Sequence, residues 1–207
     1  MLNNEITKAI EYLSKNDNVL SRLIKNYGTC KIEPHKKYFF ALLRAITGQQ
    51  LSMYAAASIE KKLMLYFNNK PTPELILQTS DENLRTIGLS NAKIKYIKDL
   101  SEKVLNKKIT LRGISKMSDE EIINELTKVK GIGIWTVHMF LIFTLGRLNV
   151  LPYTDLGIRK AVMLNYGLKN LPDSNKVIKI AKEKNWHPYC TIASIYLWKS
   201  LNNQPES

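Results

Sequence analysis

Two glycines one residue apart, in the stretch KVKGIGIWTVHMF (128–140), could hold a phosphate group. Glycine tolerates positive φ and lets backbone amides approach a ligand closely, so Gly131 and Gly133 predict a tight turn. The apolar run after them predicts a new helix, whose positive end would face the same ligand. We therefore predict a site that binds one phosphate group through the amides from Gly131 to Trp135 and the flanking Lys130. Binding at such a site would not depend on base sequence. The alternative is a turn between two helices that serves only packing.

A single carboxylate, Asp155, precedes another predicted helix in the stretch LPYTDLGIRKAV (151–162). A side-chain oxygen at the start of a helix accepts hydrogen bonds from the first amides, so this segment by itself favours a helix N-cap. The positive helix end also favours the charged form of the carboxylate. Capping the helix and acting in chemistry are therefore compatible roles for Asp155.

The charge balance predicts a polyanionic partner. Lys and Arg number 31 against 18 Asp and Glu, which gives a formal net charge of +13 and a pI near 9.6. Nucleic acid is the first expectation, ahead of an acidic membrane surface. No apolar run approaches the ~18 residues that cross a bilayer, and the N-terminus has an early acid and no apolar leader core. We expect a protein with no membrane partner that is cytoplasmic and nucleoid-associated, or nuclear in a eukaryote.

The sequence predicts neither a metal site nor a cofactor. Cys30 and Cys190 cannot supply the four ligands of a zinc site or an iron–sulfur cluster, so both are expected to be free thiols. The three histidines lack metal-ligand spacing and are interpreted as structural: His35, His138 and His187.

The elements that must position these groups are predicted to be helices. Apolar residues recur at helical spacing along most of the chain, and alternating strand patterns are scarce. Thr79 with Glu82 and Ser118 with Glu121 fit the spacing of a capping box. We predict about ten short helices in two helical lobes, with the segment 105–113 as an extended connection between the lobes.

Four ordered stretches resemble one protein family. The hairpin region 126–147 is similar to the helix-hairpin-helix of DNA glycosylases of the HhH-GPD superfamily, in the branch of 3-methyladenine DNA glycosylase II. The stretch FALLRAITGQQLSMYAAASI (40–59) resembles the Gly-Gln-Gln-x-Ser helix pair of that branch. The stretch 151–162 resembles the segment with its catalytic aspartate, and WHPYCTIASIYLW (186–198) resembles its closing helix. The resemblance covers residues ~35 to 200.

The resemblance implies an all-α, two-lobed HhH-GPD fold with a cleft between the lobes. Residues 1–207 would form a single catalytic domain in the compact form, without an N-terminal β-domain. One lobe would span 40–150 and end in the helix-hairpin-helix at 118–145. The second lobe would combine 1–39 with 151–207. Lys130 stands where the family commonly has proline, and we expect it to add a phosphate contact.

The resemblance also implies a reaction on duplex DNA that contains damaged bases. The nucleotide would swing out of the duplex, and Asp155 would stabilise the oxocarbenium-like sugar and align water. Trp135 occupies the position where strand-cutting relatives carry a Schiff-base lysine, so the enzyme should be monofunctional. We expect a monomer that excises alkylated purines and leaves an abasic site.

Several side chains would contact the DNA at the family's positions. Met139 stands where the bacterial enzyme has a tyrosine, and the loop GLSNAK (88–93) corresponds to the family's wedge into the base stack. Two alternatives stay open: Trp198 could be a core aromatic, and both the wedge loop and the Gln-Gln-x-Ser turn could be simple helix-capping turns. The base pocket is predicted from Trp135, Met139, Trp198 and Gln49, and the DNA contacts from Lys130, Gly131, Gly133, Ile134, Thr136, Gln50, Ser52, Leu89, Ser90 and Asn91.

Two other functions fit the same residues. An enzyme of this fold could act on uracil, hypoxanthine or 8-oxoguanine instead of an alkylated purine. Alternatively, the chain could be a catalytically silent DNA-binding helix-hairpin-helix protein. Asp155 discriminates the last possibility, because a silent binder has no need of that carboxylate.

Overall fold

The computed structural model describes residues 2–202, with the side chain of residue 202 left out, and it divides the chain into two compact units. Unit 2 is the continuous segment His35–Phe140, and unit 1 combines the chain up to Pro34 with the chain from Leu141 onward. All regular elements among the described residues are helices, which confirms the all-α prediction. No helix in this part of the chain is long and apolar enough to cross a membrane.

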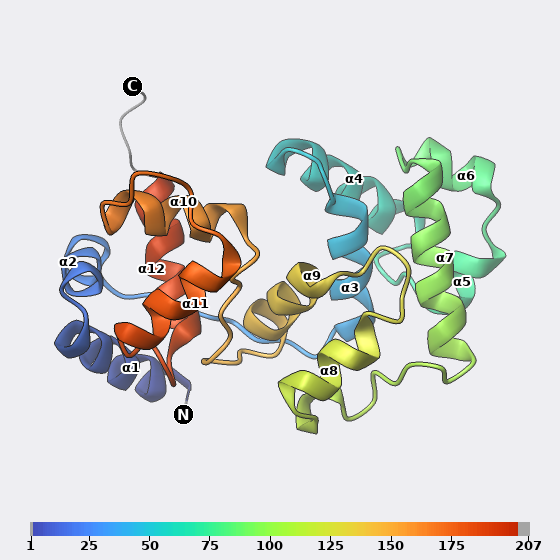
Figure 1. Cartoon of the computed structure of the whole chain (residues 1–207). Coiled ribbons are helices and arrows are strands. Elements are labelled where there is room, and N and C mark those ends of the chain that lie inside the picture. The colour runs from blue at the N-terminus through green and yellow to red at the C-terminus, as the bar shows by residue number, and fades with distance from the viewer. Residues whose placement is uncertain (1, 203–207) are drawn as a thin grey trace. The chain divides into compact units, whose positions relative to one another are not determined.

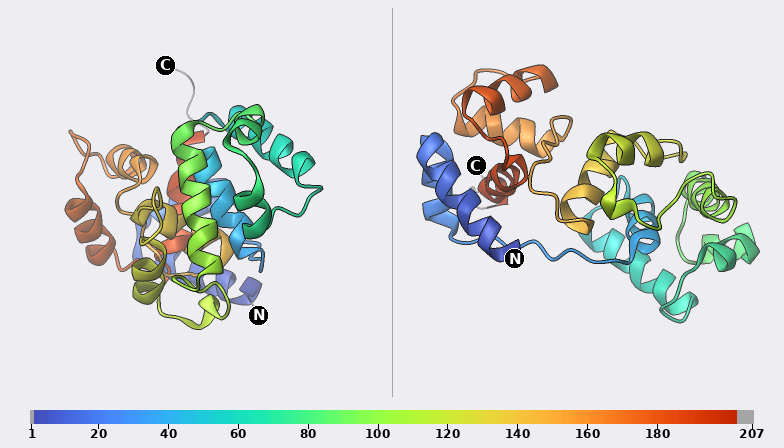
Figure 2. Two further views of the ribbon diagram at one scale, coloured as in Figure 1. Left: turned by 90° about the vertical axis from the view of Figure 1, so that its right-hand side faces the viewer. Right: turned by 90° about the horizontal axis from the view of Figure 1, so that it is seen from below.

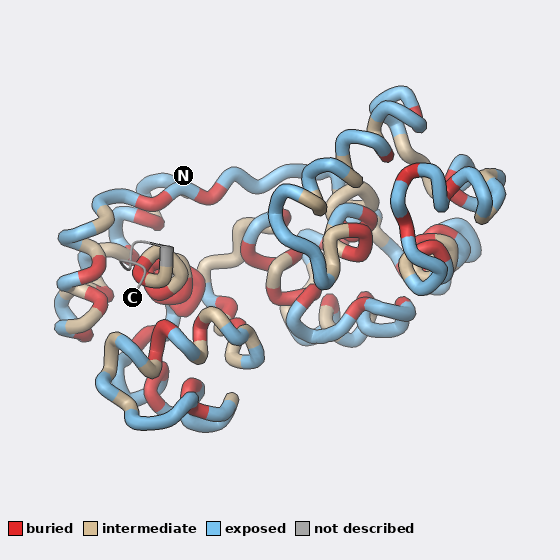
Figure 3. Tube along the Cα trace, turned by 90° about the horizontal axis from the view of Figure 1, so that it is seen from above, coloured by how far each residue is buried: buried red, intermediate tan, exposed pale blue. Residues whose placement is uncertain are grey.

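Unit 2 carries the hairpin and is built around the pairing of α3 with α4 and α7. Figure 1 shows these helices, and the left view of Figure 2 shows α7 in front of α3. Buried residues follow the inward sides of the helices, as the red positions in Figure 3 indicate. The elements of unit 2 are α3 (Tyr38–Gly48), α4 (Met53–Tyr66), α5 (Pro73–Gln78), α6 (Asp81–Thr86), α7 (Asn91–Leu105), the 3-10 turn η1 (Ile114–Lys116), α8 (Asp119–Leu126) and α9 (Ile134–Met139).

Unit 1 brings the two ends of the chain together. Helices α1 and α2 pack on α12, and α12 packs on α10. The elements of unit 1 are α1 (Leu2–Asn16), α2 (Asn18–Tyr27), α10 (Leu156–Asn165), α11 (Ser174–Glu183) and α12 (Cys190–Asn202); the π-helical turn η2 (Phe140–Thr144) leads into this unit.

A buried carboxylate joins the beginning and the end of unit 1. Asp17 is only 2% exposed and caps α2, where its Oδ1 accepts the amide of Val19 at 2.8 Å. Its Oδ2 accepts the hydroxyl of Tyr166 at 2.5 Å and the indole N–H of Trp186 at 2.8 Å. Because a buried carboxylate needs such donors, these bonds fix α2 against residues more than 140 positions later.

The predicted helix starts are right at one site and wrong at another. Ser118 and Glu121 form the capping box of α8, as predicted. The N-cap of α6 is Ser80, whose Oγ accepts the amide of Asn83 at 3.2 Å, and Thr79 instead closes α5. The predicted N-cap of α6 is wrong by one residue, because the adjacent hydroxyl side chains of Thr79 and Ser80 could both have capped the helix.

The boundaries of the units differ from the lobes expected from the sequence. The chain passes between units at Pro34–His35 and at Phe140–Leu141, rather than near residues 39 and 150. The segment 105–113 does not connect the units, because it lies wholly inside unit 2. It turns back after α7, where the amide of Thr110 donates to Glu125 Oε1 of α8 at 2.9 Å.

Candidate functional site

The hairpin between α8 and α9 depends on glycine at its first position. Gly131 has φ +82°, and a Cβ there would stand 2.3 Å from the ring of Tyr96. An L-residue would therefore meet both backbone strain and a collision. The turn is further closed by the bond from the amide of Ile132 to the carbonyl of Val129 at 3.1 Å.

Gly133 has a different role from the one expected. Its φ of −99° and ψ of 175° are extended backbone that any residue adopts, so the prediction of two left-handed glycines is wrong at this position. A Cβ on Gly133 would meet no atom within 4 Å. Gly133 is the N-cap of α9 and makes no side-chain cap bond. The start of α9 is thus open to a ligand on this side.

Two side chains hold the hairpin against the rest of unit 2. Gln49, just after α3, donates from Nε2 to the carbonyl of Gly131 at 2.7 Å. Asp99 of α7 accepts the backbone amide of Lys130 at 2.8 Å through Oδ2, and Lys103 at 2.5 Å through Oδ1. Partial burial raises the pKa of Asp99, but the bonds from Lys103 and Lys130 outweigh it and lower that pKa below its usual value. The turn is therefore fixed before any ligand arrives.

The side chains of the hairpin divide into exposed and buried ones. Ile134 and Trp135 are 40% and 43% exposed, and Lys130 is exposed, so a core role for Trp135 is excluded. Met139 is half-buried. Thr136 is only 3% exposed, so it does not offer the DNA contact predicted for it.

The turn from α3 to α4 is a capped turn with unusual exposure. Ser52 caps α4 by accepting the amide of Ala55 at 3.3 Å, as the alternative interpretation predicted. Gln50 is exposed and has φ +56°, a conformation that a non-glycine residue rarely adopts. Met53 and Tyr54 follow it at 85% and 88% exposure. Sequence reasoning missed these two exposed side chains, because the apolar spacing of α4 predicted a helix but did not indicate a function for Met53 and Tyr54.

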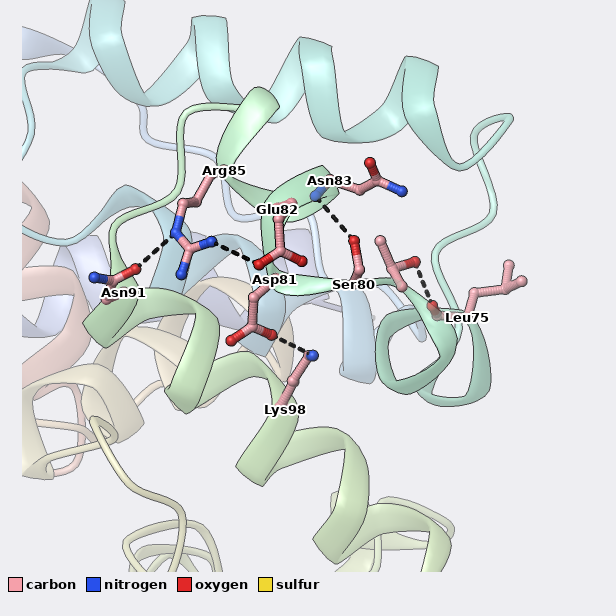
Figure 4. A network of polar contacts seen from close by, with 9 residues as sticks. Leu75, Ser80, Asp81, Glu82, Asn83, Arg85, Asn91 and Lys98 are labelled. Atoms are coloured by element: carbon pink, nitrogen blue, oxygen red, sulfur yellow. Dashed lines mark hydrogen bonds and ion pairs between the residues drawn. The ribbon is translucent and has the colours of Figure 1, made fainter.

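The loop 88–93 does not present a leucine at its tip. Leu89 is 4% exposed, so the wedge expected at 89–91 is reduced to Ser90 and Asn91. Ser90 caps α7 through the amide of Lys93, and Asn91 accepts Arg85 at 2.9 Å. Figure 4 shows Arg85 between Asn91 and Glu82, with the ion pair of Lys98 and Asp81 below them. The alternative interpretation, a helix-capping turn, describes this loop.

Lys93 anchors the same loop to α3. Its Nζ donates to the carbonyl of Thr47 at 2.8 Å, and partial burial lowers the pKa of Lys93. This lysine is therefore engaged within unit 2 rather than directed at a ligand.

In unit 1, Asp155 combines a helix cap with a bond to an aromatic residue. Its Oδ1 accepts the amide of Ile158 at 2.7 Å, which makes Asp155 the N-cap of α10. The same oxygen accepts the indole N–H of Trp198 from α12 at 2.8 Å. The carboxylate is thus held at the positive end of α10 by two donors from different helices.

Trp198 lies at the edge of the unit 1 core. Its ring is partly buried, and it packs on Phe143 with ring centroids 5.9 Å apart. A Cβ on Gly157 would stand 2.9 Å from Asp155 Oδ1 and 3.2 Å from the Trp198 ring. Gly157 therefore makes room for the bond between the two. Sequence reasoning missed the contributions of Gly157 and Phe143, although Gly157 follows the carboxylate by only two residues.

The structure thus shows two separate constellations. Unit 2 joins Gln49 to an open, glycine-lined helix start, and unit 1 joins Asp155 to Trp198. The described residues contain no group of three or more His, Cys, Asp or Glu side chains that could hold a metal ion. The amides at the start of α9 and Lys130 could bind a phosphate group. The Asp155 carboxylate could stabilise positive charge.

Comparison with known proteins gives consistent matches. The model of the HhH-GPD superfamily base excision DNA repair protein matches residues 43–187. An alkylbase DNA glycosidase-like protein of Schizosaccharomyces pombe is 38% identical over 93% of this chain and 92% of its own length. DNA-3-methyladenine glycosylase 1 of the same yeast is 37% identical over 94% of this chain and 87% of its own length. The solved structure of S. pombe 3-methyladenine DNA glycosylase in complex with abasic DNA superposes with a TM-score of 0.87, at 35% identity, over 97% of this chain and 99% of that chain.

Proposed function

The chain belongs to the HhH-GPD superfamily of base excision DNA repair proteins, and on this premise we propose that it is a monofunctional DNA glycosylase that excises alkylated purines from duplex DNA. The observation that carries the proposal is the paired bonding of Asp155, which holds one carboxylate rigidly at the start of α10. A protein that only bound DNA could cap α10 equally well with an uncharged Ser or Asn, so the proposal depends on the charge of Asp155 rather than on the cap.

The proposed reaction is hydrolysis of the bond between the base and the deoxyribose C1′. As this bond breaks, its electron pair leaves with the base and positive charge builds on the sugar. The Asp155 carboxylate stabilises that charge, and a water molecule adds its hydroxyl to C1′. The water proton goes to solvent or to the departing base, and an abasic site remains.

Hydrogen bonding fixes Asp155 for this role. Its Oδ1 is held by Ile158 and Trp198, so little reorganisation of the carboxylate is needed as charge develops. Preorganisation of this kind lowers the barrier, because the cost of orienting the group was met when the protein folded.

Aromatic rings account for the proposed choice of base. An alkylated purine carries positive charge, and a cation is attracted to the face of an indole ring. Trp135 presents an exposed ring on α9 of unit 2, and Trp198 presents a partly exposed ring in unit 1. We assign Trp135 and Trp198, with Met139 and Gln49, to recognition of the flipped base.

The hairpin is proposed to hold the DNA backbone. The first turn of α9 directs amides and the positive helix end past Gly133, where no side chain stands in the way. The exposed Lys130 adds a charge beside it. Gln50, exposed in a left-handed conformation, together with Ser52 and the loop side chains Ser90 and Asn91, is proposed to contact the duplex around the vacated position.

The absence of strand cleavage follows from the residue at position 135. Tryptophan has no amine to form an imine with the sugar, so elimination of the 3′ phosphate is not driven. Lys128, which comes before the turn at Gly131, forms an ion pair with Glu125 at 2.6 Å. Borohydride added during the reaction should trap no covalent protein–DNA adduct, and strands should stay intact until alkali is added. An adduct that disappears when one lysine is replaced would place the chain among the lyases.

A base-release assay tests the substrate assignment. Matched duplexes should carry 3-methyladenine, 7-methylguanine, uracil, hypoxanthine or 8-oxoguanine, with single-turnover release measured for each. We expect the methylated purines to be released fastest. Faster release of a neutral lesion would favour the alternative substrates, and no release from any duplex would favour a silent DNA binder. The proposed activity requires a compartment that contains DNA, and the monomeric state stays a prediction.

A further inference from the structure

A second basic surface lies in unit 2, in a groove around the start of α3. The groove encloses about 540 Å³ and is formed by the beginning of α3, the end of α4, the loop after α4 and the segment before η1. Pockets of about 300–1,000 Å³ are typical of sites that bind small ligands. None of the DNA-contacting residues assigned above lines this groove.

The charge on this groove is of one sign. Lys36, Lys37, Lys70 and Arg112 line it, and all four are exposed. No carboxylate from the described part of the chain is among the lining residues. No described acid lies within ion-pair distance of the four side chains either, whereas several other lysines of unit 2 are paired, as Lys103 is with Asp99. Uncompensated cations around a concavity favour an anionic occupant.

The groove also contains three consecutive aromatic residues. Tyr38, Phe39 and Phe40 begin α3, line the groove and are only half-buried. The Tyr38 ring also makes an edge contact with Phe140, with ring centroids 6.0 Å apart, so Phe39 and Phe40 are the main candidates for stacking. Aromatic rings in a basic groove are the combination with which proteins bind single-stranded nucleic acid, since cations hold the phosphates while bases stack on the rings. The bases of an intact duplex are already stacked on one another, and an acidic peptide need not offer flat rings. A single strand therefore fits both features of the groove.

The groove and the hairpin lie at opposite ends of α3. Tyr38 opens the helix in the groove, whereas Gln49, after its last residue, donates to the carbonyl of Gly131 in the hairpin. Eleven helical residues separate these ends by about 16 Å. The groove is therefore a second site and not an extension of the phosphate site proposed at the hairpin.

We propose that this groove, with its four cations and three aromatic residues, binds a short single-stranded segment of nucleic acid. The inference goes beyond the proposed base excision, because it concerns a site that would be occupied without a lesion and without a duplex. In the cell it would let the protein stay attached to unpaired stretches of DNA.

The test measures binding of a fluorescent hexamer of deoxythymidine to the full chain by anisotropy. Lys37→Glu/Lys70→Glu should weaken this binding about tenfold or more and make its salt dependence shallower by about 1.4 in log–log slope, at about 0.7 for each lost phosphate contact. Phe39→Leu, which keeps an apolar side chain but removes the stacking face, should weaken it roughly fivefold to tenfold. The matched control is Lys15→Glu/Lys25→Glu, which makes the same charge change on exposed lysines of unit 1 and should have a smaller effect.

Three outcomes would overturn the proposal. In the first, the groove variant behaves like the charge-matched control. In the second, Phe39→Leu binds the hexamer with unchanged affinity. In the third, a hexaglutamate peptide displaces the oligonucleotide as well as unlabelled deoxythymidine hexamer does. Base release from a methylated duplex is measured on the same variants and should be retained, so a failure of the groove proposal is separated from a failure of the proposed glycosylase activity.

Discussion

The helix starts of α9 and α10 solve the same electrostatic problem in opposite ways. Each presents the positive end of a helix dipole and amides that need acceptors. In α10 the acceptor is internal, since Asp155 bonds the amide of Ile158. In α9 the N-cap is Gly133, which has no side chain to supply one. The difference is that the start of α9 has no side-chain acceptor, whereas the start of α10 is filled by a carboxylate. We propose that the first binds an outside anion and that the second acts in the reaction.

The largest expected effect comes from removing the negative charge of Asp155 at the N-cap of α10. Asp155→Asn keeps a good N-cap, so we expect the free energy of unfolding to change by less than about 0.5 kcal/mol. Single-turnover base release should fall by about a hundredfold to a thousandfold, because the carboxylate acts as charge develops on the sugar. Duplex affinity should change little. A correctly folded variant with a near wild-type rate would show that Asp155 is only a cap.

A carboxylate placed at the N-cap of α9 should stabilise the protein and weaken its binding to duplex DNA. Gly133→Asp places a carboxylate where the backbone is extended and where a Cβ meets no atom within 4 Å. We expect the protein to gain about 0.5–1 kcal/mol of stability from the new cap, while duplex affinity falls about tenfold, because the carboxylate repels phosphate and occupies the amides. Thermal unfolding and anisotropy titration measure the two changes.

Gly133→Ser is the matched control for this variant, since it supplies a cap without a charge. Its duplex affinity should lie between those of the wild type and Gly133→Asp. If Gly133→Asp binds duplex as tightly as the wild type, the start of α9 is not the phosphate site.

Removing the second donor to Asp155 should have a smaller effect on base release than Asp155→Asn has. Trp198→Phe removes the 2.8 Å bond from Nε1 and keeps an aromatic ring beside Phe143. Base release should slow about tenfold, which corresponds to ~1.4 kcal/mol for a bond to a charged group. The ratio of rates for cationic and neutral lesions should also fall, because phenyl is a weaker partner for cations than indole. An unchanged rate would limit Trp198 to packing.

The smallest expected effect comes from removing the positive charge of Lys130 beside the start of α9. Lys130→Ala should leave the hairpin in place, because the bond to Asp99 comes from the backbone amide. Duplex affinity should weaken equally for all sequences, and the log–log salt slope should become shallower by about 0.9. Titrations between 50 and 200 mM salt on lesion-free duplexes measure this change. An unchanged slope would remove Lys130 from the interface.

The local part of this comparison could be predicted from sequence. The position of Asp155 before a helix and the capping box at Ser118 both depend on residues within four positions of each other, and the structure confirms both. The glycine requirement at Gly131 also follows from its place in a turn. These features are set by the backbone and by neighbouring side chains, which a pattern can report.

Other features could not be predicted because they depend on distant residues. The bond between Trp198 and Asp155 spans 43 positions, and the anchoring of the hairpin by Asp99 spans 31. Leu89 is buried, although the resemblance to the family's wedge loop placed it at the tip of that loop. Gly133 was expected to share the conformation of Gly131, but the second glycine already belongs to the start of α9.

The Asp17 network sets an order in which the chain can fold during synthesis. Asp17 leaves the ribosome early, yet its partners Tyr166 and Trp186 follow 149 and 169 residues later. Unit 2 is continuous and needs no later residue, so it can fold while the rest of the chain is being made. Helices α1 and α2 pack on each other, but the apolar sides that they turn toward α12 stay uncovered until α12 emerges. The unit that carries Asp155 is therefore the last to form. With the proposed roles of the two units, the newly made protein would bind DNA backbone before it could cut a base from it.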